Sequence, residues 1–399
     1  MGSDNVPTWF WWLWFAAAIV GHFGLYLSIY NRLNAFGFPR RRIKQTEWVL
    51  LITCLLTPLG LAWRYGDFLN AVVWGRPHWS DFPSGLYAYT LVCLATWIYP
   101  GIGWLWTRPI FGFQRLPVAK RIQHVDVQQA VAVPLALSAK CRFQSRWPMN
   151  QIFQLSIEEK QLPVRGLPAE LDGLKIAHLS DIHLTGHIAS DFFQYAVERA
   201  NEWQPDMMML TGDIVDYDRC IDWLEPCFGH ARAPHGRFFV LGNHDTRVCN
   251  PADVRAEMTR IGWQDVGSRV LDHSIGKTAI RLLGNEAPWF PAPPASASPS
   301  TPPTSDFRIA VCHSPDRIGW ARRQGVALML AGHTHGGQGR LPLAGPLLSP
   351  SFHGSRFASG EFYLAPTTMH VSRGLSGVHL LRLRCPPELA LLVLRCVPS

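Results

Sequence analysis

Five short polar clusters, rich in histidine, aspartate and asparagine, follow one another along the chain. They are Asp181-Ile182-His183, Gly212-Asp213, Gly242-Asn243-His244-Asp245, His313 and Gly332-His333-Thr334-His335. Imidazole, carboxylate and amide groups are suitable ligands for divalent transition metals. Two such ions held about 3.5 to 4 Å apart supply a bridging hydroxide and neutralise charge on the oxygens of a phosphate ester. The clusters therefore predict a two-metal site that cleaves phosphoesters.

The spacing within the clusters agrees with shared ligation. Asp181 and His183 are two positions apart, so both side chains can point to one ion, whereas adjacent residues would point in opposite directions. His333 and His335 repeat this spacing.

The remaining cluster residues have different chemical uses. Asp213 follows the apolar run 207–210 and a glycine suited to a tight turn, which makes it the natural bridging carboxylate. Asn243 offers a neutral carbonyl oxygen as a ligand, and the next residue, His244, is left free to meet the substrate.

Each polar cluster follows a short apolar run, and these runs predict buried strands that present ligands at their carboxyl ends. The runs are residues 174–180, 207–211, 238–241, 308–312 and 327–331. Residues 189–203 predict a helix with Ser190 as N-cap, and Asn250-Pro251 predicts the start of another. The repeating order of strand, ligand loop and helix predicts a layered α/β fold with the active site along one sheet edge.

Long apolar stretches near the N-terminus predict a membrane region over residues 1–116. Residues 9–30 are long enough to cross a bilayer core, and residues 48–63 and 86–106 are edged by tryptophan or tyrosine, as expected at the headgroup level. We therefore expect about three transmembrane helices. His22 in the first stretch could be a functional group or could pack against a partner helix.

The charges of the loops predict the orientation in the membrane. Basic residues follow the first and third stretches: Arg32, Arg40, Arg41, Arg42 and Lys44, then Arg108, Arg115, Lys120 and Arg121. By the positive-inside rule, the first loop and everything after the third span are cytoplasmic. The expected location is a multi-pass protein of the cell inner membrane with a cytoplasmic catalytic domain, and a chain with only two spans would place this domain on the other side.

The net charge limits the binding partners that we expect, and the cysteines indicate the state of the thiols. Much of the net charge of +8 lies in the loops beside the expected spans, so anionic lipid is the expected partner and nucleic acid is not. The nine cysteines include no CxxC pair, which suits reduced thiols.

Residues 117–150 show no firm period and are expected to form a connector or an amphipathic segment on the membrane. Residues 151–399 form the catalytic domain, with a mobile, proline- and serine-rich surface insertion at 288–305.

With all five motifs in order, the chain resembles the calcineurin-like metallophosphoesterases, and among them a membrane-associated bacterial branch whose last motif reads GHTHGGQ. The resemblance covers residues from about 161 onward, including Leu171-Asp172-Gly173 and Ser372-Arg373-Gly374-Leu375. It implies a β-sandwich flanked by helices.

The resemblance also implies a role for each motif residue. Asp181, His183 and His335 would hold one ion. The other ion would be held by Asn243, His313 and His333, and Asp213 would bridge the two. His244 would protonate the leaving oxygen or stabilise phosphoryl charge, with Asp245 orienting it. Asp216, in the family's GDxxD pattern, would support a ligand by a hydrogen bond.

The implied activity is hydrolysis of a phosphodiester or pyrophosphate bond in an amphiphilic substrate at the membrane, such as UDP-2,3-diacylglucosamine in lipid A biosynthesis. Two alternatives stay open. The enzyme could act on soluble substrates, with the spans as an anchor only, or the chain could be a non-catalytic membrane scaffold. The donor types suit manganese, zinc, iron or a similar ion and do not choose among them.

Overall fold

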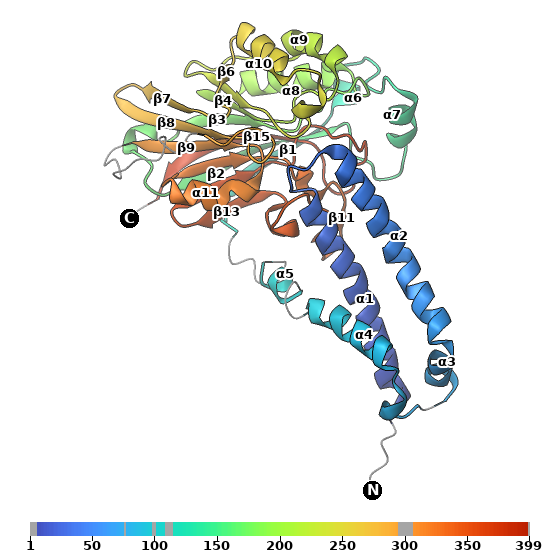
Figure 1. Cartoon of the computed structure of the whole chain (residues 1–399). Helices are drawn as coiled ribbons and strands as arrows, with labels where there is room; N and C mark the ends of the chain where they lie inside the picture. The colour runs from blue at the N-terminus through green and yellow to red at the C-terminus, as the bar shows by residue number, and fades with distance from the viewer. Residues whose placement is uncertain (1–5, 76, 98–100, 108–114, 294–305, 398–399) are drawn as a thin grey trace. The chain divides into compact units, whose positions relative to one another are not determined.

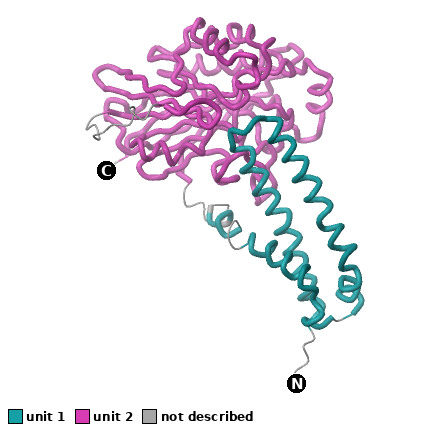
Figure 2. The backbone as a smooth tube through the Cα atoms, in the orientation of Figure 1, with its two compact units in different colours: residues 1–113 teal, residues 114–399 magenta. Residues whose placement is uncertain are grey.

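The computed structural model describes residues 6–75, 77–97, 101–107, 115–293 and 306–397 (Figure 1). The chain forms two compact units, residues 1–113 and residues 114–399 (Figure 2). The first unit is helical, and the second contains all five polar clusters.

The first unit contains two helices that are long and apolar enough to cross a membrane, α1 and α2, and a shorter apolar helix, α4. Its helices are α1 (Thr8–Leu33), α2 (Arg40–Arg64), α3 (Gly66–Trp74), α4 (Ser84–Thr96) and α5 (Ile102–Thr107). The third predicted span, 86–106, includes parts of α4 and α5, and its residues 98–100 lie outside the described residues. A third crossing therefore stays a prediction.

His22 on α1 packs inside this unit. Its side chain is almost fully buried, with Nδ1 at the hydroxyl of Tyr89 on α4 and Nε2 2.8 Å from the carbonyl oxygen of Cys54 on α2. Both ring nitrogens therefore have partners on neighbouring helices, and the packing interpretation accounts for this histidine.

The second unit is built on two large sheets and a short two-stranded one, β11 (Arg340–Leu341) with β12 (Gly345–Pro346). The seven-stranded sheet has the order β1-β2-β15-β3-β4-β5-β6, and the six-stranded sheet has the order β13-β14-β10-β9-β8-β7. The strands of the first are β1 (Ala119–Asp126), β2 (Gln154–Val164), β3 (Lys175–Leu179), β4 (Met207–Thr211), β5 (Arg237–Val240), β6 (Gln264–Asp265) and β15 (Glu388–Cys396). Those of the second are β7 (Val270–Ile275), β8 (Thr278–Asn285), β9 (Phe307–Cys312), β10 (Leu328–Ala331), β13 (Gly360–Leu364) and β14 (Thr367–Val371).

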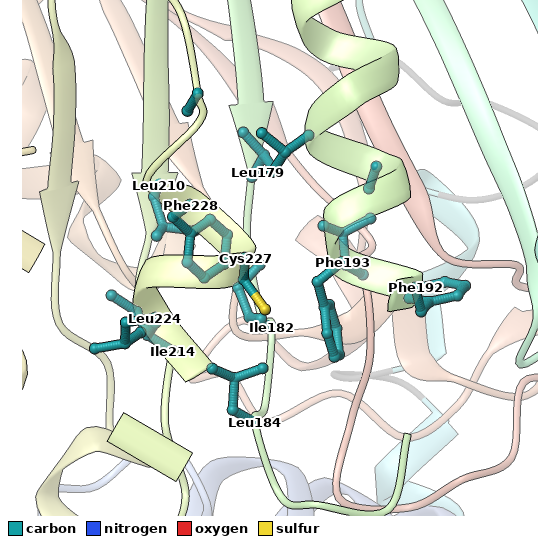
Figure 3. Packing of buried hydrophobic residues seen from close by; sticks show 14 of the residues in the cluster. Leu179, Ile182, Leu184, Phe192, Phe193, Leu210, Ile214, Leu224, Cys227 and Phe228 are labelled. Carbon is teal, nitrogen blue, oxygen red and sulfur yellow. The ribbon is translucent and has the colours of Figure 1, made fainter. Parts of the chain in front are cut away.

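The described residues of this unit also form the helices α6 (Val127–Ala130), α7 (Ala139–Gln144), α8 (Ser190–Glu202), α9 (Leu224–Phe228), α10 (Pro251–Arg260) and α11 (Ile318–Arg323). Strand β4 shows how the layers form. Met207 and Met209 face the core between the sheets, while Met208 and Leu210 pack with Phe193 of α8 in the core beneath the helices (Figure 3). A strand buried on both faces reads as a continuous apolar run.

Helix α11 contributes Ile318 and Ala321 to a third core on the outer face of the six-stranded sheet. The architecture is thus helix, sheet, sheet, helix, and the predicted layered fold is confirmed.

The segment predicted as a connector, 117–150, belongs partly to the seven-stranded sheet. Strand β1 pairs with β2 along its whole length, from Ala119 opposite Gln161 to Asp126 opposite Gln154. It is the edge strand and is exposed on both faces except at Val125, so its sequence carries no alternation of apolar and polar residues. Without that alternation, the strand could not be recognised from the sequence.

The two predicted helix starts differ in outcome. Helix α10 begins as expected, because the side chain of Asn250 accepts a hydrogen bond from the amide of Ala252. The predicted N-cap of α8 was one residue late: Ala189 is the cap and Ser190 is the first helical residue. The hydroxyl of Ser190 instead accepts a hydrogen bond from the side chain of Gln194 one turn later.

A buried ionic cluster joins the two sheets around Lys160 of β2. The ammonium group lies 2.6 Å from Glu388 of β15, 2.7 Å from Glu361 of β13 and 3.3 Å from Glu158. Burial disfavours the charged amine, yet these three carboxylates raise the pKa of Lys160. Arg373 adds a second cation against Glu158 and Glu388. The charges are therefore paired largely out of contact with water.

Replacing Lys160 by methionine is expected to destabilise the protein by about 3 to 5 kcal/mol, because buried carboxylates would lose their partner. Thermal unfolding of the detergent-purified chain measures this loss as a lower Tm. Arg395→Gln is the matched control, since the ion pair with Asp172 and the hydrogen bond to Gln161 that it breaks are both exposed. Equal Tm shifts in the two variants would show that the cluster does not contribute as proposed.

Candidate metal centre

The polar clusters lie at the carboxyl ends of strands from both large sheets. Asp181, Asp213 and Asn243 follow β3, β4 and β5 of the seven-stranded sheet, whereas His313 and His333 follow β9 and β10 of the six-stranded sheet. The prediction of a site along one sheet edge was therefore incomplete. The ligands come from two sheets, and their assignment to sheets depends on long-range strand pairing that no local pattern reveals.

The turns after the strands hold unusual backbone conformations. Positive φ angles between 50° and 70° occur at Asp181, His183, Asp213, His333 and His335. Such conformations cost non-glycine residues about 1 to 3 kcal/mol each and are kept only where the surroundings fix them. Ile182, between two of these residues, is fully buried in the core beneath the helices (Figure 3). Its side chain anchors the turn while the flanking polar side chains point to the site.

A first group of potential ligands contains Asp181, His183, Asp213 and His335, whose ligand atoms all lie within 4.8 Å of one another. His183 donates from Nδ1 to Asp216 at 2.8 Å, and His335 donates from Nδ1 to the carbonyl oxygen of Ser376 at 3.2 Å. With the Nδ1 protons so used, the Nε2 lone pairs of the two imidazoles face each other at 3.3 Å. Two facing lone pairs repel unless a cation lies between them.

A second group contains Asp213, His313 and His333. His313 donates from Nδ1 to the carbonyl oxygen of Thr211 at 2.7 Å, so Nε2 carries the lone pair when the imidazole is neutral. This atom lies 3.0 Å from Oδ1 of Asn243, 3.3 Å from Oδ1 of Asp213 and 3.1 Å from Nδ1 of His333. Acceptors therefore converge here too, as around a bound cation.

Asp213 belongs to both groups. Its Oδ1 accepts a hydrogen bond from the amide of His244, while its Oδ2 is buried without a hydrogen-bond partner among the described residues. Burial disfavours its charged form, yet His313 and His244 hold the pKa of Asp213 well below the ordinary value. Burial likewise disfavours charged His313, but Asp213 raises its pKa to about 9, so a proton on Nε2 would have to leave when this atom binds an ion. The charged, partly unpaired carboxylate and the facing lone pairs fit two divalent cations bridged by Asp213.

His244 is oriented by a different aspartate from the one predicted. Its Nδ1 lies 2.6 Å from Oδ1 of Asp216, whose other oxygen receives the hydrogen bond of His183. The prediction that Asp245 orients His244 was therefore wrong. The carboxylate of Asp245 is fully buried and accepts hydrogen bonds from three backbone amides, those of Ile214, Val215 and Gly242. Asp245 thus fixes the turns that carry Asp213 and Asn243.

Arg247 is a site residue that the sequence reading missed. Its guanidinium donates to Oδ1 of Asp216 and to Nε2 of His244, at 2.6 Å and 2.7 Å. The signal in the sequence was its position three residues after His244, which is one turn of a short helix. Arg247 brings a permanent positive charge to the side of the site where His244 lies.

Trp289 also contacts the site, although it lies in the segment predicted not to pack. Its ring centroid is 4.8 Å from that of His333 and 5.4 Å from that of His313. Its neighbour Phe290 packs against the core beneath the helices. The start of the predicted insertion 288–305 is therefore a wall of the site, and residues 294–305 lie outside the described residues.

Comparisons with known proteins agree with this geometry. Residues 174–337 match the calcineurin-like phosphoesterase family. The chain is 30% identical to the uncharacterized metallophosphoesterase YkuE of Bacillus subtilis over 57% of this chain and 82% of that protein. The chain belongs to the calcineurin-like metallophosphoesterases, a family of enzymes that use divalent metals.

Two further relatives are informative. A transmembrane protein with metallophosphoesterase domain from Danio rerio is 30% identical over 50% of this chain and 48% of that protein. The UDP-2,3-diacylglucosamine pyrophosphatase LpxG of Chlamydia muridarum is 24% identical over 57% of this chain and 85% of that protein. The first of these, together with α1 and α2, indicates membrane association.

Asp216→Asn is expected to weaken metal binding by about 10- to 100-fold, because Asp216 orients His183 through a hydrogen bond. The amide could accept from only one side, so its NH₂ would oppose the donors of His244, His183 or Arg247. Competition with a chromogenic chelator measures the affinity. Asp222→Asn, at an exposed aspartate in the short 3-10 helix Asp218–Trp223, is the control and should bind normally. Unchanged affinity in Asp216→Asn would contradict this role.

Proposed function

We propose that the protein hydrolyses a phosphodiester or pyrophosphate bond of an amphiphilic substrate at the membrane, and that UDP-2,3-diacylglucosamine is the leading candidate. The observation that carries the hydrolytic part is the pair of ligand groups that share Asp213. A binding protein or scaffold has no need of such a set, which argues against a non-catalytic role.

The donor set suits two ions such as manganese, zinc or iron. When bound, these ions supply activation of water as the nucleophile and neutralisation of phosphoryl charge. Asp181, His183 and His335 would hold one ion, Asn243, His313 and His333 the other, and Asp213 both. Each histidine of the first group is fixed by a hydrogen bond from its Nδ1, so the ligand atoms are oriented before an ion arrives.

His244, Asp216 and Arg247 form a separate unit beside these ligands. The Nε2 of His244 is held by Arg247, and the imidazole keeps some exposure, 12% of its side chain. We propose that this edge meets the phosphoryl group and the leaving oxygen, and that the positive charge of Arg247 favours the developing negative charge there. Burial lowers the pKa of His244 to about 4, despite the nearby Asp213 and Asp216.

The lipid part of the proposal is supported by α1 and α2 and by the similarity to LpxG. Arg40, Arg41, Arg42 and Lys44 lie in the first turns of α2, and they favour a cytoplasmic loop before it. If residues 86–106 provide a third crossing, the chain after them returns to the cytoplasm, and we propose a multi-pass inner-membrane protein of this topology, with its catalytic unit in the cytoplasm.

The test is hydrolysis of UDP-2,3-diacylglucosamine by the detergent-purified chain after chelation and addition of manganese, magnesium or zinc. Release of UMP that is absent in Asp213→Ala supports the full proposal. If bis-p-nitrophenyl phosphate is cleaved but no UMP appears, the hydrolase stands and this substrate is refuted.

Removing the membrane unit distinguishes the membrane proposal from the alternative, an enzyme for soluble substrates. The deletion should cover residues 1–113, because a longer one would remove β1 from the seven-stranded sheet. If the truncated protein keeps its rate on the soluble diester and loses its rate on the lipid substrate, the membrane proposal is favoured. Equal retention of both activities favours the alternative.

A further inference from the structure

A surface formed by residues 137–149 of the catalytic unit exposes large apolar side chains. Leu137, Phe143, Trp147 and Met149 keep 45%, 65%, 42% and 73% of their surface exposed. Phe143 and Trp147 touch each other edge to face, with ring centroids 5.7 Å apart. Scattered exposed apolar residues are ordinary on protein surfaces, but a contiguous cluster marks an interaction site.

The 137–149 surface is fixed to the domain beneath it. Cys141 of α7 and the preceding Leu135 are fully buried in the core under the helices. The hydroxyl of Ser138 caps α7 by accepting a hydrogen bond from the amide of Cys141. Because one side of α7 is held in the core, its opposite side faces outward. The exposure of these apolar side chains therefore follows from the fold.

The charged side chains within residues 137–149 are all basic, and Asp126 of β1 lines a surface hollow with Arg142 and Arg146. Lys140, Arg142 and Arg146 are exposed, and none of them forms an ion pair within the described part of the chain. Residues 131–149 include no aspartate or glutamate. Ordinary soluble surfaces intersperse both signs of charge. Aromatic and basic side chains without acidic ones are the combination suited to the headgroup region of an anionic bilayer.

The 137–149 surface adjoins the loops that carry metal ligands. The amide of Leu137 donates to the carbonyl oxygen of His187, and the Ser138 hydroxyl bonds Nδ1 of His187, four residues after His183. Lys140 donates to the carbonyl oxygen of Val378, two residues after the Ser376 that holds His335. The surface thus lies on the side of the metal centre formed by the first ligand group.

We propose that the 137–149 surface docks on the interface of a bilayer containing anionic phospholipid. Phe143 and Trp147 enter the upper acyl region, and Lys140, Arg142 and Arg146 contact phosphate groups. This contact is additional to the candidate spans of the first unit, because it belongs to the catalytic unit. It brings the loops after His183 and His335 next to lipid headgroups, independently of which phosphoester is cleaved.

The full-length protein, reconstituted in nanodiscs with a phospholipid that carries a photoreactive diazirine in its acyl chain, provides the test. After illumination, peptides are mapped by mass spectrometry, and α1 serves as the internal positive control. We expect lipid adducts within residues 137–149. The double variant Phe143→Ser/Trp147→Ser should lose them several-fold while α1 stays labelled.

The charged part is tested with Lys140→Gln/Arg142→Gln/Arg146→Gln in anionic and in zwitterionic discs. In anionic discs, each cation removed should shift the docking equilibrium by about fivefold, and zwitterionic discs should show little effect. Bis-p-nitrophenyl phosphate hydrolysis should be unchanged in both variants, which shows an intact metal centre.

The proposal is overturned if α1 is labelled and residues 137–149 are not, or if the double variant is labelled as strongly as the parent. Equal docking in both lipids would refute the role of the three cations. A parallel loss of diester hydrolysis in the double variant would assign these side chains to folding instead. None of these outcomes depends on the identity of the natural substrate.

Discussion

Replacing Asp213 by alanine is expected to remove metal binding and hydrolysis together. Among the described residues, Asp213 is the only one that belongs to both of these groups of metal ligands. Its loss therefore removes a ligand from both metal positions at once. The rate should fall by about 10⁴-fold or more, since two-metal activation of the nucleophile accounts for a large part of an enzyme's acceleration. Steady-state hydrolysis of bis-p-nitrophenyl phosphate measures the rate, and elemental analysis of the purified protein measures metal content.

Two comparisons make this result specific. Asp213→Asn keeps an oxygen for the amide of His244 but replaces the second oxygen by an NH₂ group and removes the charge, so it separates loss of the bridging anion from collapse of the turn. Asp222→Ala should behave as the parent, because Asp222 is exposed on the surface. An Asp213→Ala protein that retains about the parental metal content would refute the bridging role.

His244→Ala is expected to give the opposite pattern of metal content. Both ions should remain, because His244 is in neither of the two groups that share Asp213, although it forms a third potential group with His183 and Asp216, and Asp216 keeps its hydrogen bond to His183. Turnover should fall by about 10²- to 10⁴-fold, the usual contribution of a group that transfers a proton or stabilises charge at the reacting centre. The loss should appear in kcat at saturating metal.

Arg247→Gln distinguishes two functions of this pair. If His244 acts through the charge that Arg247 places at its Nε2, the Arg247 variant should lose much of the same factor in kcat. If His244 acts alone, the Arg247 variant should keep most of its rate.

Indistinguishable metal contents in Asp213→Ala and His244→Ala would contradict the division of roles between Asp213 and His244.

The sequence predicted the local parts of the site and missed the parts that depend on distant contacts. Asp181 with His183, and His333 with His335, were recognisable because each pair lies in one turn after one apolar run. The partner of His244 was not, because Asp216 is 28 residues away along the chain and reaches it only after β4 and β5 pair. Asp245, the neighbour in sequence, turned out to hold backbone amides.

The same distinction applies to the fold. The apolar runs identified β3, β4, β5, β9 and β10, since strands buried on both faces have a clear composition. Strand β1 was missed because an exposed edge has no such composition. Trp289 was missed because it lies in a proline-rich segment whose composition does not predict packing, yet its ring packs on two histidines. Neither β1 nor Trp289 belongs to a periodic pattern of apolar residues in the sequence.

The position of β15 has a consequence for synthesis of the protein. This strand comes after every other described strand in the chain, yet it lies between β2 and β3, in the middle of the seven-stranded sheet. All seven candidate ligands precede β15 in the chain. They are therefore synthesised before the sheet that supports Asp181 can be completed. Glu388, the first residue of β15, also completes the charges around Lys160. During translation, the seven-stranded sheet is therefore complete only after β15 has been made and has paired with β2 and β3, and stable capture of metal is expected to follow this pairing.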